Sequence, residues 1–249
     1  MARRLEVALI DVGGTLWPNS WPIRQTDGEG RRHRVRTAMF GYDKNIVDAL
    51  VDDLLSSSRP GDEARTVTTE APMVFGADEL ITGCLHRQGL PVDAQTISRI
   101  RRAMAIPVHD RFQLLPGARE LLQAIRELGM RTVVASNTYW RDADSYWEDF
   151  RALGVGDLID GIVTSVDAGH LKPHPAVFEL AMRWAGVDAH QCVVIGNRED
   201  NDIGPALALG MKTILVYPDD PKPEHTRADA MAPDLWACAQ VVRDMLENE

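Results

Sequence analysis

No stretch of this sequence approaches about 18 uninterrupted apolar residues, the length that a membrane-spanning helix needs. The first residues, MARRLEVALIDVGG, carry two arginines but lack the apolar region and the small-residue cleavage site of a signal peptide. We therefore expect neither a membrane span nor a membrane partner.

Cysteine is scarce as well: Cys84, Cys192 and Cys238 are the three in 249 residues. An odd number at wide spacing favours neither a disulfide framework nor a zinc site. Cys192 opens an apolar run, so we expect a buried thiol there. These features predict a reducing compartment, and we expect the chain to be cytoplasmic.

Basic residues are outnumbered: 27 lysines and arginines face 37 aspartates and glutamates, a formal net charge of −10. Proteins that bind nucleic acid or anionic membranes generally present basic faces, so we expect no nucleic-acid partner. A small-molecule anionic substrate stays compatible with this balance, because a basic pocket can form locally in an acidic protein. The composition fixes no oligomeric state.

Short apolar runs alternate with helical patterns along most of the chain. Helical examples span residues 117–128 and 175–184, and the apolar runs are Leu5 to Ile10, Arg131 to Ala135, Gly161 to Thr164, Cys192 to Ile195 and Thr213 to Val216. This alternation predicts an α/β fold, a Rossmann-like parallel sheet core with helices on both faces. Ligands of such sheets bind outside the carboxyl ends of the strands.

The alternation breaks between residues 17 and 111. WPNSWPIRQTDGEGRRHR is typical of an irregular entry and SSSRPGDEARTVTTEAP of a loop, while helical patterns run around Val35 to Leu55, Gly76 to Gln88 and Asp93 to Met104. Asp78 and Asp93 are expected N-caps. We predict an all-α cap domain at 17–111, inserted into a core domain at 1–16 and 112–249 that ends in a helix, LWACAQVVRDML.

Asp11 stands at the carboxyl end of the first apolar run, just before Gly13 and Gly14. Glycines without side chains let a ligand approach the backbone closely. An aspartate in such a crevice can act as a covalent nucleophile toward a phosphoryl group or a carbon centre. The alternative interpretation is a plain strand followed by a turn.

Three further polar motifs follow later runs. Ser136 and Asn137 can hydrogen-bond anionic oxygens or simply cap a helix. Lys172 lies in the proline-stiffened HLKPHP, where its ammonium can neutralise a carboxylate and a phosphate together or be exposed on the surface. The segment GNREDNDIG offers oxygen ligands that suit Mg²⁺, or an acidic helix start, with Asn197, Glu199, Asp200, Asn201 and Asp202.

In their order and placement these motifs resemble the haloacid dehalogenase superfamily of hydrolases. That family shows D-x-D-G-T-hydrophobic at a strand end, then Ser/Thr-Asn, a Lys before Pro, and Gly-Asp followed by acidic residues. The matching positions here are Asp11 to Leu16, Ser136-Asn137, Lys172-Pro173, Gly196-Asn197 with Asp202, and Gly210-Met211. The likeness covers residues 1–16 and 112–220, and the insert matches the family's α-helical cap by position.

The resemblance implies a Mg²⁺-dependent phosphatase or phosphotransferase that attacks a small phosphorylated metabolite and forms an aspartyl-phosphate. The catalytic residues would be the nucleophile, two hydroxyls for the phosphoryl oxygens, an amide and a stabilising ammonium: Asp11, Thr15, Ser136, Asn137 and Lys172. The metal would be held by two carboxylates, one of them through water or in the second shell, a backbone carbonyl and an amide: Asp11, Asp202, Gly13 and Asn197.

Two positions depart from the family pattern. Gly13 replaces the second aspartate, which in phosphatases of the superfamily protonates the leaving group and later activates water. General acid–base help of that kind is worth about 10²–10⁴ in rate. Asn197 replaces the usual aspartate, so one negative charge is lost from the metal site and the affinity for Mg²⁺ should fall.

These departures leave other interpretations open. The first is a phosphatase or phosphotransferase whose substrates have good leaving groups, or whose missing acid comes from the insert, where His33, His86 and Asp43 are candidates. Dehalogenases of the superfamily carry an aromatic residue at the Gly13 position, and phosphonatases carry alanine there together with a cap lysine, for which Lys44 is the only lysine in the insert. A catalytically inactive binding or scaffold protein is the third interpretation.

Tryptophans and arginines near the expected crevice could bind an aromatic or anionic substrate. Trp140 and Arg141, just after Ser136-Asn137, are the substrate-binding residues that we predict. The alternative is that such side chains pack the insert against the core or are solvated, and it applies above all to the residues at the insert entry: Trp17, Trp21, Arg24, Arg31, Arg32 and Arg34.

Overall fold

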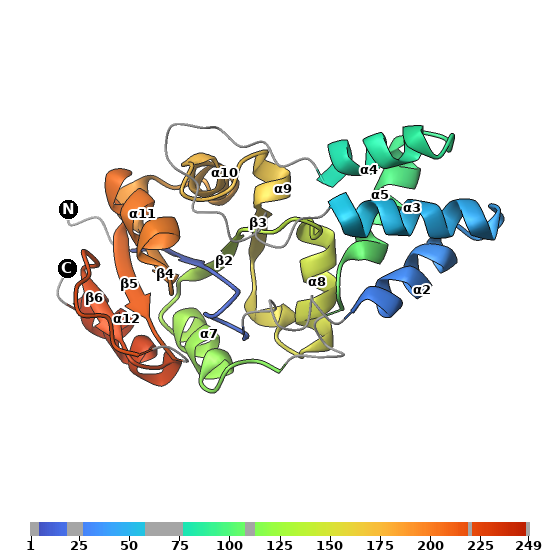
Figure 1. Cartoon of the computed structure of the whole chain (residues 1–249). Helices are drawn as coiled ribbons and strands as arrows, with labels where there is room; N and C mark the ends of the chain where they lie inside the picture. The colour runs from blue at the N-terminus through green and yellow to red at the C-terminus, as the bar shows by residue number, and fades with distance from the viewer. Residues whose placement is uncertain (1–4, 19–26, 58–76, 108–112, 219–220, 248–249) are drawn as a thin grey trace.

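The core is a six-stranded sheet in which all neighbouring strands are parallel, in the order β3-β2-β1-β4-β5-β6 (Figure 1). The computed structural model describes residues 5–18, 27–57, 77–107, 113–218 and 221–247. The strands are β1 (Val7–Ile10), β2 (Arg131–Ser136), β3 (Gly161–Thr164), β4 (Cys192–Gly196), β5 (Lys212–Val216) and β6 (Ala230–Ala232). The predicted α/β fold with a parallel sheet is confirmed.

Alternate residues of each central strand face opposite layers, which explains why the strands are continuously apolar in sequence. Ala8 and Ile10 of β1 belong to one buried cluster, whereas Val7 and Leu9 belong to another. The first cluster is covered by α7 (Ala118–Glu127), α8 (Ala143–Ala152) and α12 (Leu235–Glu247), and the second by α10 (Ala176–Ala185) and α11 (Gly204–Ala208). Helices therefore cover both faces of the sheet, as predicted.

Short helical turns complete the core: α9 (Ser165–Ala168), η1 (Gly156–Leu158), η2 (Ala189–Gln191) and η3 (Glu199–Ile203). The edge strand β6 was not predicted, because three residues of alanine and methionine after a charged segment carry no strand signal. Cys192 is buried at the start of β4, and burial raises the pKa of its thiol to about 12.

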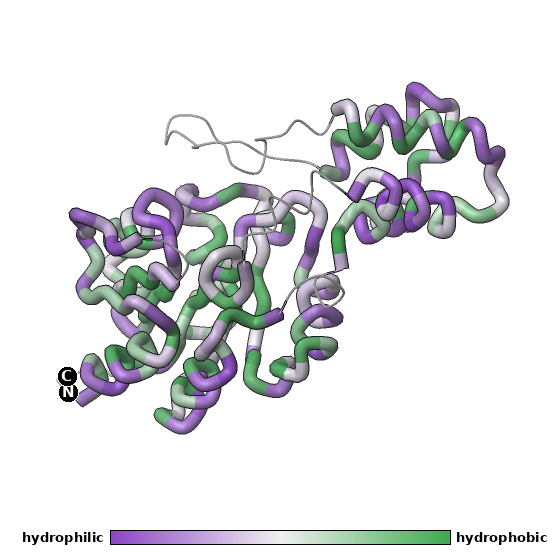
Figure 2. Tube along the Cα trace, turned by 60° about the horizontal axis from the view of Figure 1, so that its bottom comes forward, coloured by the Kyte–Doolittle hydropathy of each residue, from purple (hydrophilic) through white to green (hydrophobic). Residues whose placement is uncertain are grey.

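In the described part of the insert there are four helices: α2 (Gly28–Ala38), α3 (Lys44–Ser57), α4 (Ala77–Arg87) and α5 (Ala94–Met104). They surround an apolar cluster of their own, which includes Val35, Leu50, Leu54, Ile81, Leu85 and Ile100. In both views the insert projects to one side of the core (Figures 1 and 2). No helix in the described ranges is long and apolar enough to cross a membrane.

The helix boundaries in the insert correct two expectations. The pattern from Val35 to Leu55 is not one helix, because the chain turns between α2 and α3 with Gly41 at φ 99°. The expected irregular entry is wrong for residues 28–34, which form the first turns of α2. Arginines fill that helix and only Arg31 and Val35 are buried, so hydrophobic periodicity could not reveal it.

The two expected N-caps of the insert have different outcomes. Asp93 caps α5, since its side chain accepts a hydrogen bond from the Thr96 backbone N–H. Asp78 instead lies inside the first turn of α4, where a carboxylate still interacts favourably with the helix dipole. Most of the expected loop SSSRPGDEARTVTTEAP lies outside the described residues.

Candidate active site

Parallel strands bring three of the four motifs, those that follow β1, β2 and β4, to one edge of the sheet. β1 lies between β2 and β4, and Ile10 is in register with Val134 on one side and Ile195 on the other. Asp11 continues this ladder, with its N–H donating to the Ile195 carbonyl at 2.9 Å. Ser136 ends the neighbouring β2 on one side, and the residues after Gly196 begin beyond β4 on the other. The motifs therefore meet at the carboxyl edge of the central strands.

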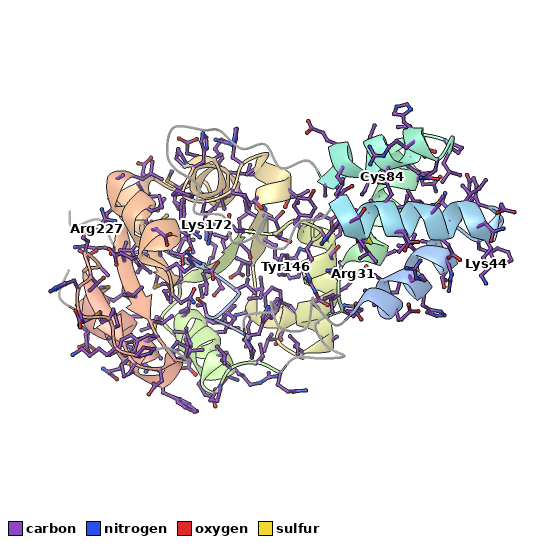
Figure 3. The ribbon with its side chains drawn as sticks, viewed as in Figure 1. Arg31, Lys44, Cys84, Tyr146, Lys172 and Arg227 are labelled. Carbon is purple, nitrogen blue, oxygen red and sulfur yellow. The ribbon has the colours of Figure 1, made fainter. Side chains whose placement is uncertain are left out.

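Lys172 is the centre of the site. Its ammonium donates to Asp11 Oδ1 at 2.7 Å, to Asp202 Oδ1 at 2.6 Å and to the Ala135 carbonyl at 2.8 Å. The side chain is 2% exposed and lies within the core (Figure 3). Every ammonium proton thus has an acceptor, as a buried cation requires. The interpretation of Lys172 as an exposed surface lysine is wrong.

The charges of this cluster determine its protonation. Burial disfavours the ammonium of Lys172, but the Asp11 and Asp202 carboxylates outweigh that effect and raise its pKa. Burial also raises the pKa of Asp202, and Lys172 opposes that rise. Lys172 consequently stays a cation, and the cluster offers positive charge directly beside Asp11.

Asn137 holds the backbone of Lys172 rather than pointing at a ligand. Its Nδ2 donates to the Lys172 carbonyl at 2.8 Å, and its Oδ1 accepts from the Lys172 N–H at 2.6 Å. Both polar groups of the amide are thereby used. The geometry favours a role in which Asn137 positions the lysine loop on the end of β2.

A tight loop follows Asp11 and presents a hydroxyl to it. The Val12 carbonyl accepts from the N–H groups of Thr15 and Leu16, and Gly14 adopts φ 81°. This left-handed conformation favours glycine. Buried Thr15 donates from Oγ1 to Asp11 Oδ2 at 3.3 Å, so the two carboxylate oxygens of Asp11 have different partners.

Asn197 packs against this loop and leaves one acceptor unused. A Cβ on Gly14 would come within 2.4 Å of Asn197 Nδ2, so only glycine allows this packing. The Asn197 Oδ1 is buried and has no hydrogen-bond partner among the described residues. A buried acceptor of this kind is costly unless a ligand occupies it.

The donors at this edge fit Mg²⁺, which prefers carboxylate, carbonyl and amide oxygens. Asp11, the Gly13 carbonyl, Asn197 and Asp202 would hold it. Asp202 is fixed there because its Oδ2 accepts from the Arg198 N–H at 3.1 Å, and a Cβ on Gly196 would collide with its carboxylate. In the described ranges no three His, Cys, Asp or Glu side chains are grouped so that they could hold a metal. The donor set proposed here therefore includes the amide oxygen of Asn197 and a backbone carbonyl.

Tyr146 contacts a residue of the site but was not predicted from the sequence. Its hydroxyl lies 3.0 Å from Ser136 Oγ, and both residues are buried. Tyr146 comes from the first turns of α8, ten residues after Ser136, and no motif marks it. Only the packing of α8 on the sheet brings the two hydroxyls together.

Trp140 and Arg141 lie apart from this cluster. Trp140 packs into the apolar cluster of the insert and meets the Tyr139 ring edge-on. Arg141 is buried, donates from Nε to Asp149 Oδ2 at 3.0 Å and donates from Nη2 to the Ile106 carbonyl. These partners favour a structural role for Arg141, although substrate binding by the pair stays a prediction.

The side chains at the insert entry have packing or ionic partners. Trp17 stacks on Tyr146 with centroids 5.7 Å apart. Arg31 and Arg34 donate to the carbonyls of Met104 and Ala103. Arg32 pairs with Asp52 at 2.5 Å. Trp21 and Arg24 lie outside the described residues.

The replacement acids proposed from the insert gain no support from their positions. His33 and His86 are exposed, and Asp43 accepts from the N–H of Asn45 at the start of α3. Lys44, the lysine that phosphonatase chemistry would need, lies at the outer tip of the insert, far from Lys172 (Figure 3).

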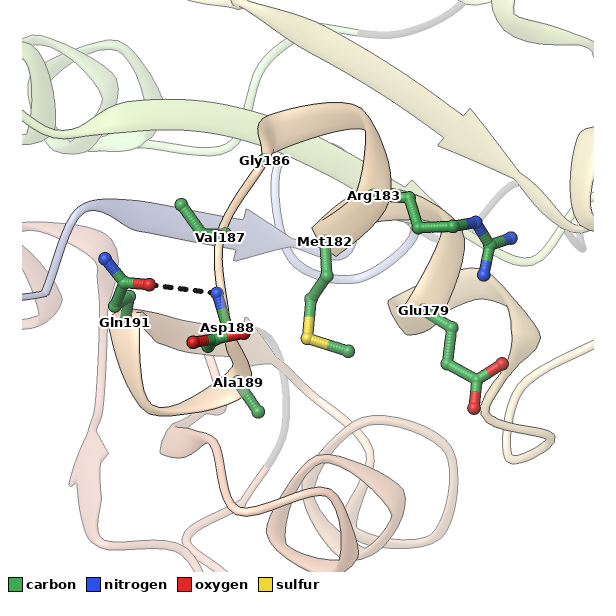
Figure 4. A pocket seen from close by; sticks show the side chains of 8 residues that line it. All are labelled: Glu179, Met182, Arg183, Gly186, Val187, Asp188, Ala189 and Gln191. Carbon is green, nitrogen blue, oxygen red and sulfur yellow. Dashed lines mark hydrogen bonds between the residues drawn. The ribbon is translucent and has the colours of Figure 1, made fainter.

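A separate pocket of about 470 Å³ lies at the opposite edge of the sheet (Figure 4). It lies where α10 ends and the chain returns to the start of β4, and its lining residues are Glu179, Met182, Arg183, Gly186, Val187, Asp188, Ala189 and Gln191. Because β4 begins there and ends at the Asp11 cluster, this pocket forms no part of the site.

The Arg141–Asp149 pair provides a stability prediction. Both side chains are less than a tenth exposed. Removing one partner of a buried pair costs about 3–5 kcal/mol, so we expect Arg141→Ala to lower the free energy of unfolding by about 3 kcal/mol. Chemical denaturation measures this free energy of unfolding. Arg198→Ala, which removes an exposed ion pair with Asp200, is the control and should cost less than about 1 kcal/mol. Equal small effects would contradict a structural role for Arg141.

Comparison with known proteins gives the site its context. A glyceraldehyde 3-phosphate phosphatase of Pyrococcus abyssi is 33% identical over 134 residues, 52% of this chain and 53% of that protein. A second, from Methanopyrus kandleri, is 26% identical over 235 residues, 93% of this chain and 92% of that protein. The chain thus spans about half the length of the first relative and nearly all of the second.

A solved structure and a family model agree with these relatives. The 2-haloacid dehalogenase of Pseudomonas syringae superposes with a TM-score of 0.61 at 20% identity, over 97% of this chain and 99% of that one, which shows a shared fold. The model of the haloacid dehalogenase-like hydrolase family matches residues 5–210, from β1 to just before β5. With the predicted motifs gathered around Lys172, the chain belongs to the haloacid dehalogenase-like hydrolases.

Proposed function

We propose that this hydrolase is a Mg²⁺-dependent phosphatase or phosphotransferase that acts on a small phosphorylated metabolite through an aspartyl-phosphate at Asp11. The observation that carries the proposal is the buried Lys172 ammonium, held 2.7 Å from Asp11 and 2.6 Å from Asp202 at the carboxyl edge of the sheet. A cation in that place offsets the repulsion between an attacking carboxylate and an anionic phosphoryl group.

The two carboxylate oxygens of Asp11 have different roles in this mechanism. Oδ1 is bound to Lys172, whereas Oδ2 accepts only a longer bond, 3.3 Å, from Thr15 among the bonds described. Oδ2 is therefore the oxygen that attacks phosphorus, forming an acyl phosphate as the bond to the leaving oxygen breaks. Water then attacks phosphorus and releases inorganic phosphate, restoring the Asp11 carboxylate.

Gly13 shapes the substrate preference within this mechanism. No side chain at position 13 can protonate the leaving oxygen, so the group must depart as an anion or take its proton from water. Leaving groups of low pKa need the least help. We therefore expect aryl and acyl phosphates to react faster than alkyl phosphates.

Asn197 and its neighbours would hold the metal. Bound Mg²⁺ would neutralise charge on the phosphoryl oxygens. Removing it with a chelator should abolish phosphate release. Asn197→Asp restores a negative charge at the orphaned acceptor, and we expect about tenfold tighter Mg²⁺ binding because ligand charge tunes cation affinity. Titration calorimetry with Mg²⁺ measures the change. Asn201→Asp, in the same segment, is the control, and equal affinities of both variants would contradict a metal at Asn197.

The test of the proposed function is a phosphate-release screen with Mg²⁺. The panel should include activated aryl and acyl phosphates and glyceraldehyde 3-phosphate, the compound in the names of the two archaeal relatives. Chloride release from a 2-haloacid without metal would favour dehalogenase chemistry instead. A wild-type chain as inert as the Asp11→Asn variant would favour a binding or scaffold role.

A further inference from the structure

We propose that Tyr146 is a positioning residue that orients the Ser136 hydroxyl toward the phosphoryl group, an inference that rests on the function proposed above. The two hydroxyl oxygens lie 3.0 Å apart, and Ser136 and Tyr146 are 2% and 5% exposed. A hydrogen bond between buried groups is electrostatically stronger than the same bond in water.

The direction follows from the number of protons. Each hydroxyl carries one proton and can also accept. Ser136 has a second neighbour, the Asn137 carbonyl at 3.4 Å, which can only accept. For Ser136 to donate its single proton to a phosphoryl oxygen, the Tyr146 hydroxyl must donate to Ser136. Tyr146 thereby frees the serine proton for the substrate and strengthens its donation, because linked hydrogen bonds polarise one another.

The Tyr146 ring is held so that its hydroxyl cannot move away. Trp17 stacks on the ring at a centroid distance of 5.7 Å and an interplanar angle of 19°, and Phe150 lies at 6.1 Å and 25°. The Arg141 guanidinium lies 5.8 Å from the ring centroid. Aromatic stacking and a cation over the ring each add stabilisation beyond simple burial. The donor is therefore preorganised before a substrate arrives.

Tyr146 also lies where the chain passes between core and insert. Trp17 stands at the point where the chain leaves the core, and Arg141 binds the Ile106 carbonyl just after α5, where the chain returns. Tyr146 contacts both residues, and it lies between Lys172 and the insert residue Arg31 (Figure 3). The orientation of Ser136 is thus set by a ring that both connections touch.

A double-mutant cycle tests this role. The variants are Tyr146→Phe, Ser136→Ala and the double variant in the full chain. We measure kcat and KM for an aryl phosphate with Mg²⁺, and the binding of orthovanadate by calorimetry, which needs no turnover. Tyr146→Phe should lower kcat and vanadate affinity about tenfold, the worth of one buried hydrogen bond to a charge-binding group. In the Ser136→Ala background the same substitution should change neither.

Three outcomes would overturn the role of Tyr146. One is an unchanged Tyr146→Phe variant, and another is a loss that simply adds to that of Ser136→Ala, which would mean that the phenol acts independently of the Ser136 hydroxyl. Tyr42→Phe, on the exposed tip of the insert, is the control for loss of a phenol and should behave as wild type. The third is a wild type that neither turns over phosphates nor binds vanadate. That result would contradict the proposed function itself, and the role of Tyr146 would fall with it.

Discussion

Replacing Asp11 with asparagine is expected to lower kcat by about 10⁴-fold or more on every phosphate ester that the wild type hydrolyses. The amide cannot form the acyl phosphate, and losing a nucleophile removes the whole covalent route. The fold should survive, because Lys172 keeps Asp202 at 2.6 Å and the cluster of two carboxylates and one ammonium becomes neutral. Single-turnover phosphate release and a thermal melt, taken together, measure both effects.

The matched control is Asp200→Asn. Asp200 lies in the same polar segment as Asn197 but is exposed and pairs with Arg198 at 3.1 Å. The Asp200→Asn variant should retain wild-type kcat. Trapping the intermediate adds a direct test, since the wild type should carry a phosphate label that hydroxylamine removes and the Asp11 variant should carry none. A folded Asp11→Asn variant with residual activity above about a tenth of wild type would end the nucleophile assignment.

Introducing aspartate at position 13 is expected to raise turnover of alkyl phosphates by about 100-fold, within the range of general acid catalysis. The structure has room for it, because a Cβ on Gly13 would meet nothing within 4 Å. Gly13 is also absent from the glycines with positive φ, so a side chain brings no backbone strain. Aryl phosphates should gain little, since their leaving groups need no proton.

The dependence of kcat/KM on the pKa of the leaving group gives the sharpest measurement. Wild type should show a steep decline toward poor leaving groups, and Gly13→Asp should flatten it. Gly13→Asn has nearly the same size without an acidic proton and should keep the steep decline. If Gly13→Asp is folded and its profile matches that of Gly13→Asn, the missing acid is not what limits this enzyme.

Much of this site was predictable because its chemistry follows the strands. Asp11, Ser136 and Asn197 each come directly after or at the end of an apolar run, and a parallel sheet must bring such ends to one edge. For Lys172 the residues alone left a site cation and an exposed surface lysine open, and the burial of its ammonium between Asp11 and Asp202 contradicts the exposed alternative. Local sequence patterns were sufficient to predict those site residues that the parallel strands bring together.

Contacts between separate elements were beyond the reach of those patterns. The partnership of Ser136 with Tyr146 depends on how α8 packs, and the burial of Arg141 depends on Asp149 and on a carbonyl of the insert. The unused acceptor of Asn197 likewise exists only because Gly14 lets the amide approach. Neither periodicity nor spacing encodes such contacts. The first turns of α2 were missed for another reason, because arginines fill them and few of their residues are buried.

Arginines from two parts of the molecule bind the backbone where α5 ends. Arg31 and Arg34 bind the carbonyls of Met104 and Ala103 from within the insert, whereas Arg141 binds the carbonyl of Ile106 from the core. The return connection is thus clamped from both bodies, with a single residue between the clamps. Ala105, whose backbone is extended, is therefore the one residue between the carbonyls that the insert binds and the carbonyl that the core binds.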